Sequence, residues 1–101
     1  MYGLHNSLKA IAGNGEQLAD ILIRASEIVG QLEGCKAYLV SSETENEDQI
    51  WVTEFWVDKE AHDASLQLPE VRALIGEAMP ILDGMPQSRP EINLIGGYGL
   101  D

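Results

Sequence analysis

The sequence has few of the residues that crosslink a chain or anchor it in a membrane. Cys35 is the only cysteine among 101 residues, so no disulfide can form within the chain. No apolar run reaches the roughly 20 residues that a membrane-spanning helix needs. The chain also opens without the positively charged and then apolar segments of a secretory signal. We therefore expect no membrane partner and a cytoplasmic location.

Basic residues are scarce as well. Six Lys and Arg stand against 17 Asp and Glu, which gives a formal net charge of -11, and the six are scattered without forming a patch. Such a chain repels phosphate backbones, so nucleic acid is not an expected partner. We interpret the acidic excess as a solvated surface rather than a cation site. A hydrophobic content of 45% excludes a disordered chain and predicts one folded domain over residues 1–101.

Several motifs that signal cofactors are missing. The sequence contains no glycine-rich phosphate loop, no Cys or His cluster at metal-ligand spacing and no nucleophile elbow. The stretch Gly96-Gly97-Tyr98-Gly99 is not followed by a helix, so we interpret it as a terminal turn. The prediction is a protein with no metal and no cofactor.

The spacing of apolar residues predicts helices and strands in alternation. Apolar positions three and four apart, from Leu18 to Leu32, predict a helix that begins at Glu16. Asp58 is a suitable N-cap for a short helix over residues 59–68, and Pro69 marks the start of a further helical run. Strand patterns cover residues 2–10, 36–40, 50–57 and 92–95, with a loop or hairpin connection at 41–48 and a loop at 84–90.

The resulting order, β-α-β-β-α-β, predicts an α+β fold of the ferredoxin-like, split βαβ type. Right-handed crossovers then place the helices on one face of an antiparallel sheet. Residues 50–57 put Trp51 and Phe55 on one side and Val52 and Trp56 on the other, so both sheet faces need cover. A second copy related by a two-fold axis supplies a matching sheet, and we predict a homodimer through this face.

Two polar residues between helices and sheet have open interpretations. Glu54 shares a strand face with Trp56 and is either a paired structural charge or a base whose pKa is raised by burial. His62 lies three residues before Ser65 on the short helix, so both side chains could reach one ligand. Alternatively, His62 is a partly exposed helix histidine satisfied by water or a carboxylate such as Asp58.

Aromatic and apolar residues complete the candidate pocket. Tyr38 and Trp56 are either core aromatics or part of a pocket lining, while Leu22 and Met79 supply apolar walls. The set that we expect to bind a substrate or ligand is Asn6, Leu22, Tyr38, Ser65, Arg72 and Met79, and the set expected to take part in catalysis is Glu54, Trp56 and His62.

Several of these residues occur together in a pattern that resembles the antibiotic biosynthesis monooxygenase (ABM) family. The pattern comprises Gly3-Leu4, Gly34-Cys35, the strand Trp51-Val52-Thr53-Glu54-Phe55-Trp56, the helix Lys59-Glu60-Ala61-His62-Asp63-Ala64-Ser65, Leu68-Pro69, the helix end Ala78-Met79-Pro80 and the tail Gly96-Gly97-Tyr98-Gly99-Leu100. The resemblance runs from Tyr2 to Leu100 and so covers nearly the whole chain.

The resemblance implies a dimeric α/β barrel in which each subunit has its own pocket. It also implies oxidation of electron-rich phenols or quinols by O₂ without metal or flavin. In such a reaction the deprotonated substrate itself reduces oxygen, so the protein binds an aromatic ring, takes a proton and stabilises an anion. Trp56, His62 and Arg72 are suited to those roles.

The chain departs from the family pattern at certain positions. Polyketide-oxidising members have Asn and Tyr where this chain has Val52 and His62, and quinol-oxidising members often have a histidine in place of Ser65. The haem-degrading branch shares Asn6, but it needs a histidine and a tryptophan where this chain has Ile75 and Ser65, so haem binding is disfavoured. Two functions remain: a cofactor-independent monooxygenase acting on a small aromatic, and a non-catalytic ligand-binding or signalling dimer on the same barrel.

Overall fold

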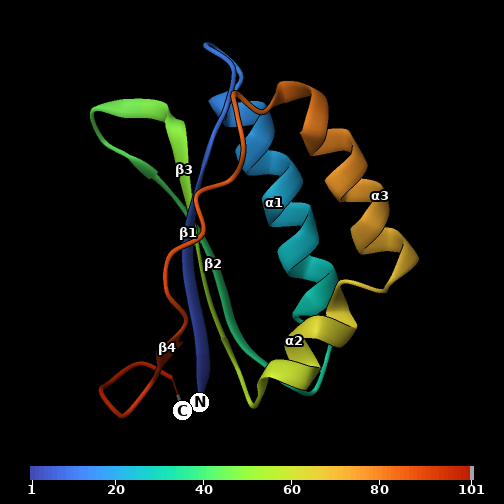
Figure 1. Ribbon diagram of the computed structural model, residues 1–101, viewed down its shortest axis with the longest axis vertical. Coiled ribbons are helices and arrows are strands. Elements are labelled where there is room, and N and C mark those ends of the chain that lie inside the picture. Colours follow the sequence, from blue (N-terminus) through green and yellow to red (C-terminus); the bar gives the residue numbers. More distant parts are fainter. Residues whose placement is uncertain (101) are drawn as a thin grey trace.

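A computed structural model describes residues 1–100 of the chain (Figure 1). The elements in chain order are β1 (Tyr2–Lys9), α1 (Gly15–Val29), β2 (Cys35–Glu43), β3 (Asn46–Trp56), α2 (Lys59–Ser65), α3 (Pro69–Ala78), a 3₁₀ turn (Met79–Ile81) and β4 (Ile92–Asn93). This is the predicted β-α-β-β-α-β order, with the second helical segment divided at Pro69.

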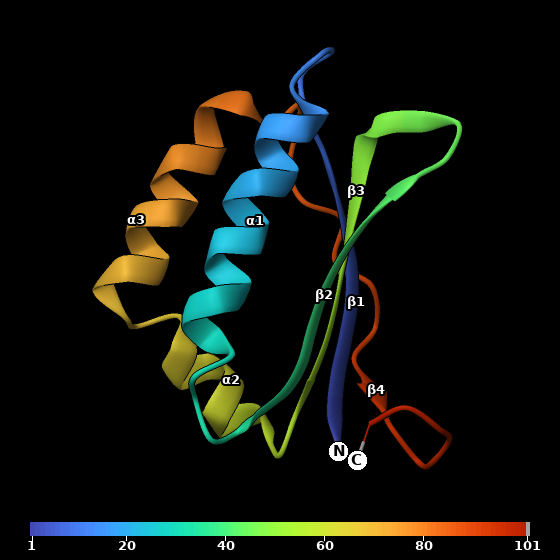
Figure 2. The same cartoon turned by 180° about the vertical axis from the view of Figure 1, so that it is seen from behind.

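The four strands form one antiparallel sheet in the order β2-β3-β1-β4. All three helices lie on the same face of this sheet (Figures 1 and 2). The segment that leads to β4 runs beside β1, at the edge of the sheet opposite β2. The predicted ferredoxin-like α+β fold is thus confirmed. In residues 1–100, no helix has both the length and the apolar character that crossing a membrane requires.

Several boundaries differ from the sequence prediction. Of the loop and the hairpin that the sequence left open for residues 41–48, the structure has the hairpin, because β2 and β3 continue into this stretch and leave only Thr44 and Glu45 as the turn. Paired strands satisfy their own backbone groups, so exposed polar side chains there are no obstacle to strand structure. Helix α1 ends at Val29, before the predicted Leu32, and β4 contains two residues rather than four.

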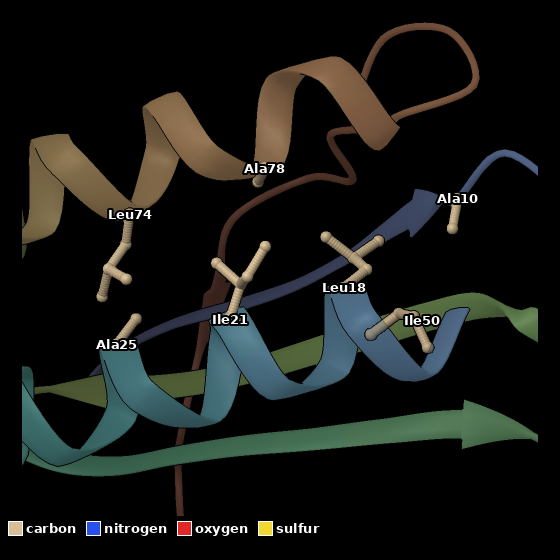
Figure 3. Close-up of a cluster of buried hydrophobic side chains, with 7 residues drawn as sticks. All are labelled: Ala10, Leu18, Ile21, Ala25, Ile50, Leu74 and Ala78. Carbon is tan, nitrogen blue, oxygen red and sulfur yellow. The ribbon is translucent and has the colours of Figure 1, made fainter. Parts of the chain in front are cut away.

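The main core lies between the helices and the sheet (Figure 3). Its buried residues are Ala10, Leu18, Ile21, Ala25, Ile50, Leu74 and Ala78. A second cluster is built around Trp56, which has no exposed surface and packs with Val29 and Val71. Trp56 therefore joins the end of α1, the start of α3 and the central strand.

Strand β3 alternates between the two faces as the sequence predicts. Val52 and Trp56 are buried under the helices, whereas Trp51 and Phe55 are half-buried on the open face. On the neighbouring strand of that face, 58% of Leu39 is exposed. An apolar sheet face is therefore left uncovered by the chain's own helices.

The start of α1 is fastened to β3 through Asp48. One carboxylate oxygen of Asp48 accepts a hydrogen bond from the Gly13 N–H at 3.1 Å, and the other accepts from the Gly15 N–H at 2.9 Å. A β-carbon on Gly15 would collide with the Glu47 carbonyl oxygen and lie 2.8 Å from the Asp48 Cα. The close approach of helix and strand thus requires glycine at position 15.

We predict opposite effects of alanine at two helical glycines. In Gly15→Ala, the added methyl group pushes the start of α1 away from β3. This change should lower the free energy of unfolding by about 1–3 kcal/mol, the usual cost of overpacking. Gly76→Ala is the matched control, because its β-carbon would meet nothing within 4 Å on exposed α3. That change should stabilise by about 0.5–1 kcal/mol. Urea unfolding measures both, and equal effects would contradict the close contact at Gly15.

Candidate functional site

Glu54 is a buried carboxyl group on the helix-covered face of β3. Only 13% of its side chain is exposed. The Trp56 indole N–H, two residues further along the same strand face, donates a hydrogen bond to Glu54 Oε1 at 3.0 Å. Because Trp56 is locked in the core, the indole fixes the direction in which this carboxyl group points.

The surroundings of Glu54 favour its protonated form. Burial raises the pKa of Glu54 above the ordinary value of 4.5, and the indole hydrogen bond and the nearby His62 act in the opposite direction as smaller effects. The carboxyl group therefore exchanges protons at a higher pH than an exposed glutamate does. The sequence leaves two interpretations of Glu54 open, a paired structural charge and a base, and a raised pKa favours the base.

His62 reaches this carboxyl group from α2. The helix begins where Asp58 Oδ1 accepts a hydrogen bond from the Ala61 N–H at 2.8 Å, as the sequence predicts. His62 Nε2 lies 3.9 Å from Glu54 Oε1, and 14% of the His62 side chain is exposed. On the other side of the ring, Nδ1 lies 3.1 Å from an oxygen of Asp63. The alternative pairing with Asp58 is not the one that forms, because that carboxylate caps the helix.

Tyr2 is a member of the site that sequence reasoning missed. Its ring centroid lies 5.7 Å from that of His62, and the Trp56 ring lies at the same distance on an edge-on approach. The Tyr2 hydroxyl donates a hydrogen bond to Glu91, which raises the pKa of Tyr2 to about 12. The register pairs Tyr2 with Trp56, so strand alternation could have placed it on this face.

Tyr38 lies opposite Glu54 in the pairing of β2 with β3. Burial, followed by the charge of Glu54, raises the pKa of the Tyr38 hydroxyl. Tyr38 therefore remains a neutral O–H donor near the carboxyl group. Cys35, in the same corner, has a thiol whose pKa is raised by burial and by Glu54, so it is a weak nucleophile.

Three residues that were predicted to contact a ligand are bonded within the chain or exposed to solvent. The Asn6 side-chain oxygen accepts a hydrogen bond from the Arg89 backbone N–H at 2.9 Å. Ser65 is buried, and its hydroxyl donates to the His62 carbonyl at 2.6 Å. Arg72 is exposed on α3. Asn6 and Ser65 therefore bond within the chain through the polar groups that were expected to contact a ligand.

An apolar cavity of about 260 Å³ lies between α1, α3 and the segment that follows them. Leu22 and Met79, the predicted apolar walls, are both part of its lining. Val71 also lines the cavity and belongs to the same buried cluster as Trp56. Within the described range, no group of three or more His, Cys, Asp and Glu side chains could hold a metal ion.

The fold and these residues agree with a known family. The family model described as antibiotic biosynthesis monooxygenase matches residues 1–77. The chain belongs to the ABM family. This confirms the resemblance drawn from the sequence, and membership in the ABM family supports a general monooxygenase-like role.

Solved structures of similar proteins share the ABM fold over nearly the whole chain. A protein from Chloroflexus aurantiacus J-10-fl, provisionally assigned as an antibiotic biosynthesis monooxygenase, is 31% identical, with a TM-score of 0.85 over 99% of this chain and 98% of the other. A provisionally assigned counterpart from Deinococcus radiodurans is 25% identical, with a TM-score of 0.79 over 98% and 100%. No curated protein matches the sequence.

We predict that the burial of Glu54 makes stability depend on pH. The folded-state pKa lies above the unfolded value, so the folded protein binds more protons than the unfolded chain between the two values. This contribution to stability is complete below about pH 4.5 and is lost as the pH rises through the folded-state pKa. Glu54→Gln should therefore gain stability relative to wild type as the pH increases from 4 to 8.

The control for this titration is Glu43→Gln. Glu43 is an exposed glutamate that also accepts a tryptophan N–H, from Trp51 at 2.9 Å. Its variant therefore controls for the loss of a tryptophan–glutamate hydrogen bond at an exposed position. Thermal unfolding at a series of pH values gives the difference of each variant from wild type, and parallel curves for the two variants would show that burial does not raise the pKa of Glu54.

Proposed function

We propose that this ABM protein is a cofactor-independent monooxygenase that oxidises a small aromatic substrate of the phenol or quinol type with O₂. The observation that supports the proposal best is the buried Glu54 carboxyl group, held by the Trp56 indole beside His62. A phenol becomes a reductant of oxygen once it loses its proton, and a carboxylate with a raised pKa is a stronger base for that proton than an exposed glutamate.

The proposed reaction needs no electron source besides the substrate. Glu54 accepts the phenolic proton, and the anion then gives its electrons to O₂. One oxygen atom enters a ring carbon as a carbonyl and the other leaves as water, so a phenol and O₂ give a quinone and water. The neutral Tyr38 hydroxyl donates a hydrogen bond to the phenolate oxygen, which stabilises the charge where it develops.

The apolar cavity is proposed to hold the apolar part of the substrate that is remote from its hydroxyl group, because Glu54 does not line the cavity. Leu22 and Met79 form two of its walls, and an apolar body of one or two rings suits a cavity of about 260 Å³. Asn6, Ser65 and Arg72 are proposed as secondary contacts, because two of them already bond within the chain and the third is exposed.

One observation favours the alternative, a ligand-binding dimer without turnover. The lining of the apolar cavity includes neither Glu54 nor His62. A ligand held wholly by that lining would be bound without contact to the proton-accepting group. The same assay separates the two functions, because binding without oxygen uptake supports the second.

We predict that oxygen consumption with a panel of hydroquinones and naphthols depends on Glu54. Glu54→Gln keeps the size of the side chain but cannot accept a proton, so turnover should fall by about 10²–10⁴-fold, the usual contribution of general base catalysis. His62→Ala and Trp56→Phe should each reduce the rate. Trace metal would instead give uptake that is indifferent to all three changes and is abolished by a chelator.

We further propose that the chain forms a homodimer through the open sheet face. Around Trp51 this face carries two basic side chains, Lys9 and Arg89, and two acidic ones, Glu43 and Asp83. This part of the face is therefore close to neutral, although the chain carries a net charge of -11. Two like-charged copies repel least through a neutral surface, and the exposed Leu39 adds apolar area to it.

The dimer is predicted to dissociate when a charge is placed on this face. Leu39→Glu introduces a carboxylate at a position that is 58% exposed in the single chain. Ile23→Glu, at a helix position that is 45% exposed, is the control. Sedimentation at micromolar concentration should give a monomer for the first variant and a dimer for the second. A monomeric wild type would contradict the proposal.

A further inference from the structure

A line of charged side chains leads from the outer surface of α2 to the buried carboxyl group. Lys59 and Asp63 are exposed to 56% and 52%, and their side chains lie 3.2 Å apart. Asp63 contacts His62 Nδ1 at 3.1 Å, and His62 Nε2 faces Glu54 across 3.9 Å. Exposure falls along this line, since only 14% of His62 and 13% of Glu54 are exposed.

A buried carboxyl group that gains a proton has to release it before the next turnover. The Trp56 indole donates to Glu54 but does not carry protons onward, because its nitrogen has no free lone pair. Tyr38, on the neighbouring strand, stays protonated since burial raises the pKa of its hydroxyl. Of the groups that neighbour Glu54 in residues 1–100, His62 is the one with a nitrogen on each side, one toward the carboxyl group and one toward the surface.

We infer that His62 is a proton relay between Glu54 and solvent, and that Asp63 is the positioning residue that sets which imidazole nitrogen faces the site. The inference rests on the proposed function, because it assigns the exit route for the proton that Glu54 takes from the substrate. The O–H bond of Glu54 breaks as a bond forms to His62 Nε2. The imidazolium then releases the proton on Nδ1 to Asp63, which passes it to water. The ring is left with its hydrogen on Nε2, and exchange of that proton with water restores the Nδ1–H form before the next turnover.

The contacts around His62 are consistent with this role. The Asp63 carboxylate only accepts hydrogen bonds, so Nδ1 carries the hydrogen and the Nε2 lone pair is directed at Glu54. Lys59 binds the other oxygen of Asp63 and so holds the carboxylate in place. The rings of Tyr2 and Trp56 confine the imidazole, and a small rotation between them would close the 3.9 Å separation. Such distances often shorten in the substrate complex.

The first test reads the imidazole directly, without any substrate. Nitrogen-15 NMR of the full chain distinguishes the two neutral tautomers of His62. Wild type should show the hydrogen on Nδ1. Asp63→Ala should convert most of the population to the tautomer with the hydrogen on Nε2, whereas Asp63→Asn, which keeps an accepting oxygen, should retain the wild-type form. Glu60→Ala, an exposed acid on the same helix, is the control and should change nothing.

The second test measures turnover with the hydroquinone panel. Asp63→Ala should lower kcat by about tenfold and leave KM unchanged, because binding does not involve Asp63 and the slowed step is proton release. In His62→Ala, the rate should rise with the concentration of added imidazole, which substitutes for the missing relay. Glu54→Gln should not respond to imidazole, since the proton acceptor itself is missing there.

The outcomes separate this inference from the proposed function. If wild type consumes no oxygen with any substrate, the monooxygenase proposal fails, and the tautomer experiment still decides the role of Asp63. If wild type turns over and His62→Ala is insensitive to imidazole, the relay is wrong while the monooxygenase stands. An Nε2–H tautomer in wild type would overturn the assignment of Asp63.

Discussion

The hydrogen bond from the Trp56 indole to Glu54 is the contact on which the rest of the site depends. It joins Trp56, the largest fully buried side chain in residues 1–100, to a carboxyl group that burial makes costly to ionise. The indole satisfies one carboxyl oxygen without neutralising the group. A lysine or arginine at that place would have formed an ordinary ion pair, which favours the ionised carboxylate and lowers its pKa.

The architecture of the ABM fold explains how one strand supports both a pocket and a sheet surface. Side chains alternate along β3, so the chain that places Glu54 and Trp56 under the helices also places Trp51 and Phe55 on the opposite face. The two surfaces share a backbone but no side chain. Under the proposed function, changes on the open face are expected to affect association and changes on the helix-covered face to affect the chemistry.

Most of the fold could be predicted from the sequence, because it depends on the period of the apolar residues. The alternation in residues 50–57 and the helical spacing from Leu18 onward indicated the correct faces. A hairpin was one of the two connections predicted for residues 41–48, but the extent of β2 and β3 into it was difficult to predict because exposed strand ends have no apolar pattern. The end of α1 depends on local turns after Val29, which leave no signature in apolar spacing.

The site was predictable only in part. Alternation placed Glu54 beside Trp56, and helical spacing placed His62 and Ser65 on one side of the short helix, but neither pattern shows which atoms meet. Tyr2 was missed because it lies at the chain terminus, and Asp63 because an acid on a solvated helix carries no distinguishing pattern. The bonds that Asn6 and Ser65 make to backbone groups are likewise not revealed by a sequence pattern.

Infrared difference spectroscopy of the carboxyl group tests the central claim most directly. The C=O band of a protonated carboxylic acid that is present in wild type and missing in Glu54→Gln belongs to Glu54. We predict that this band persists well above pH 4.5, the ordinary value for glutamate, and shifts when an aromatic ligand binds. A band that disappears near pH 4.5, as for an exposed glutamate, would contradict the account of a buried proton acceptor at the centre of this site.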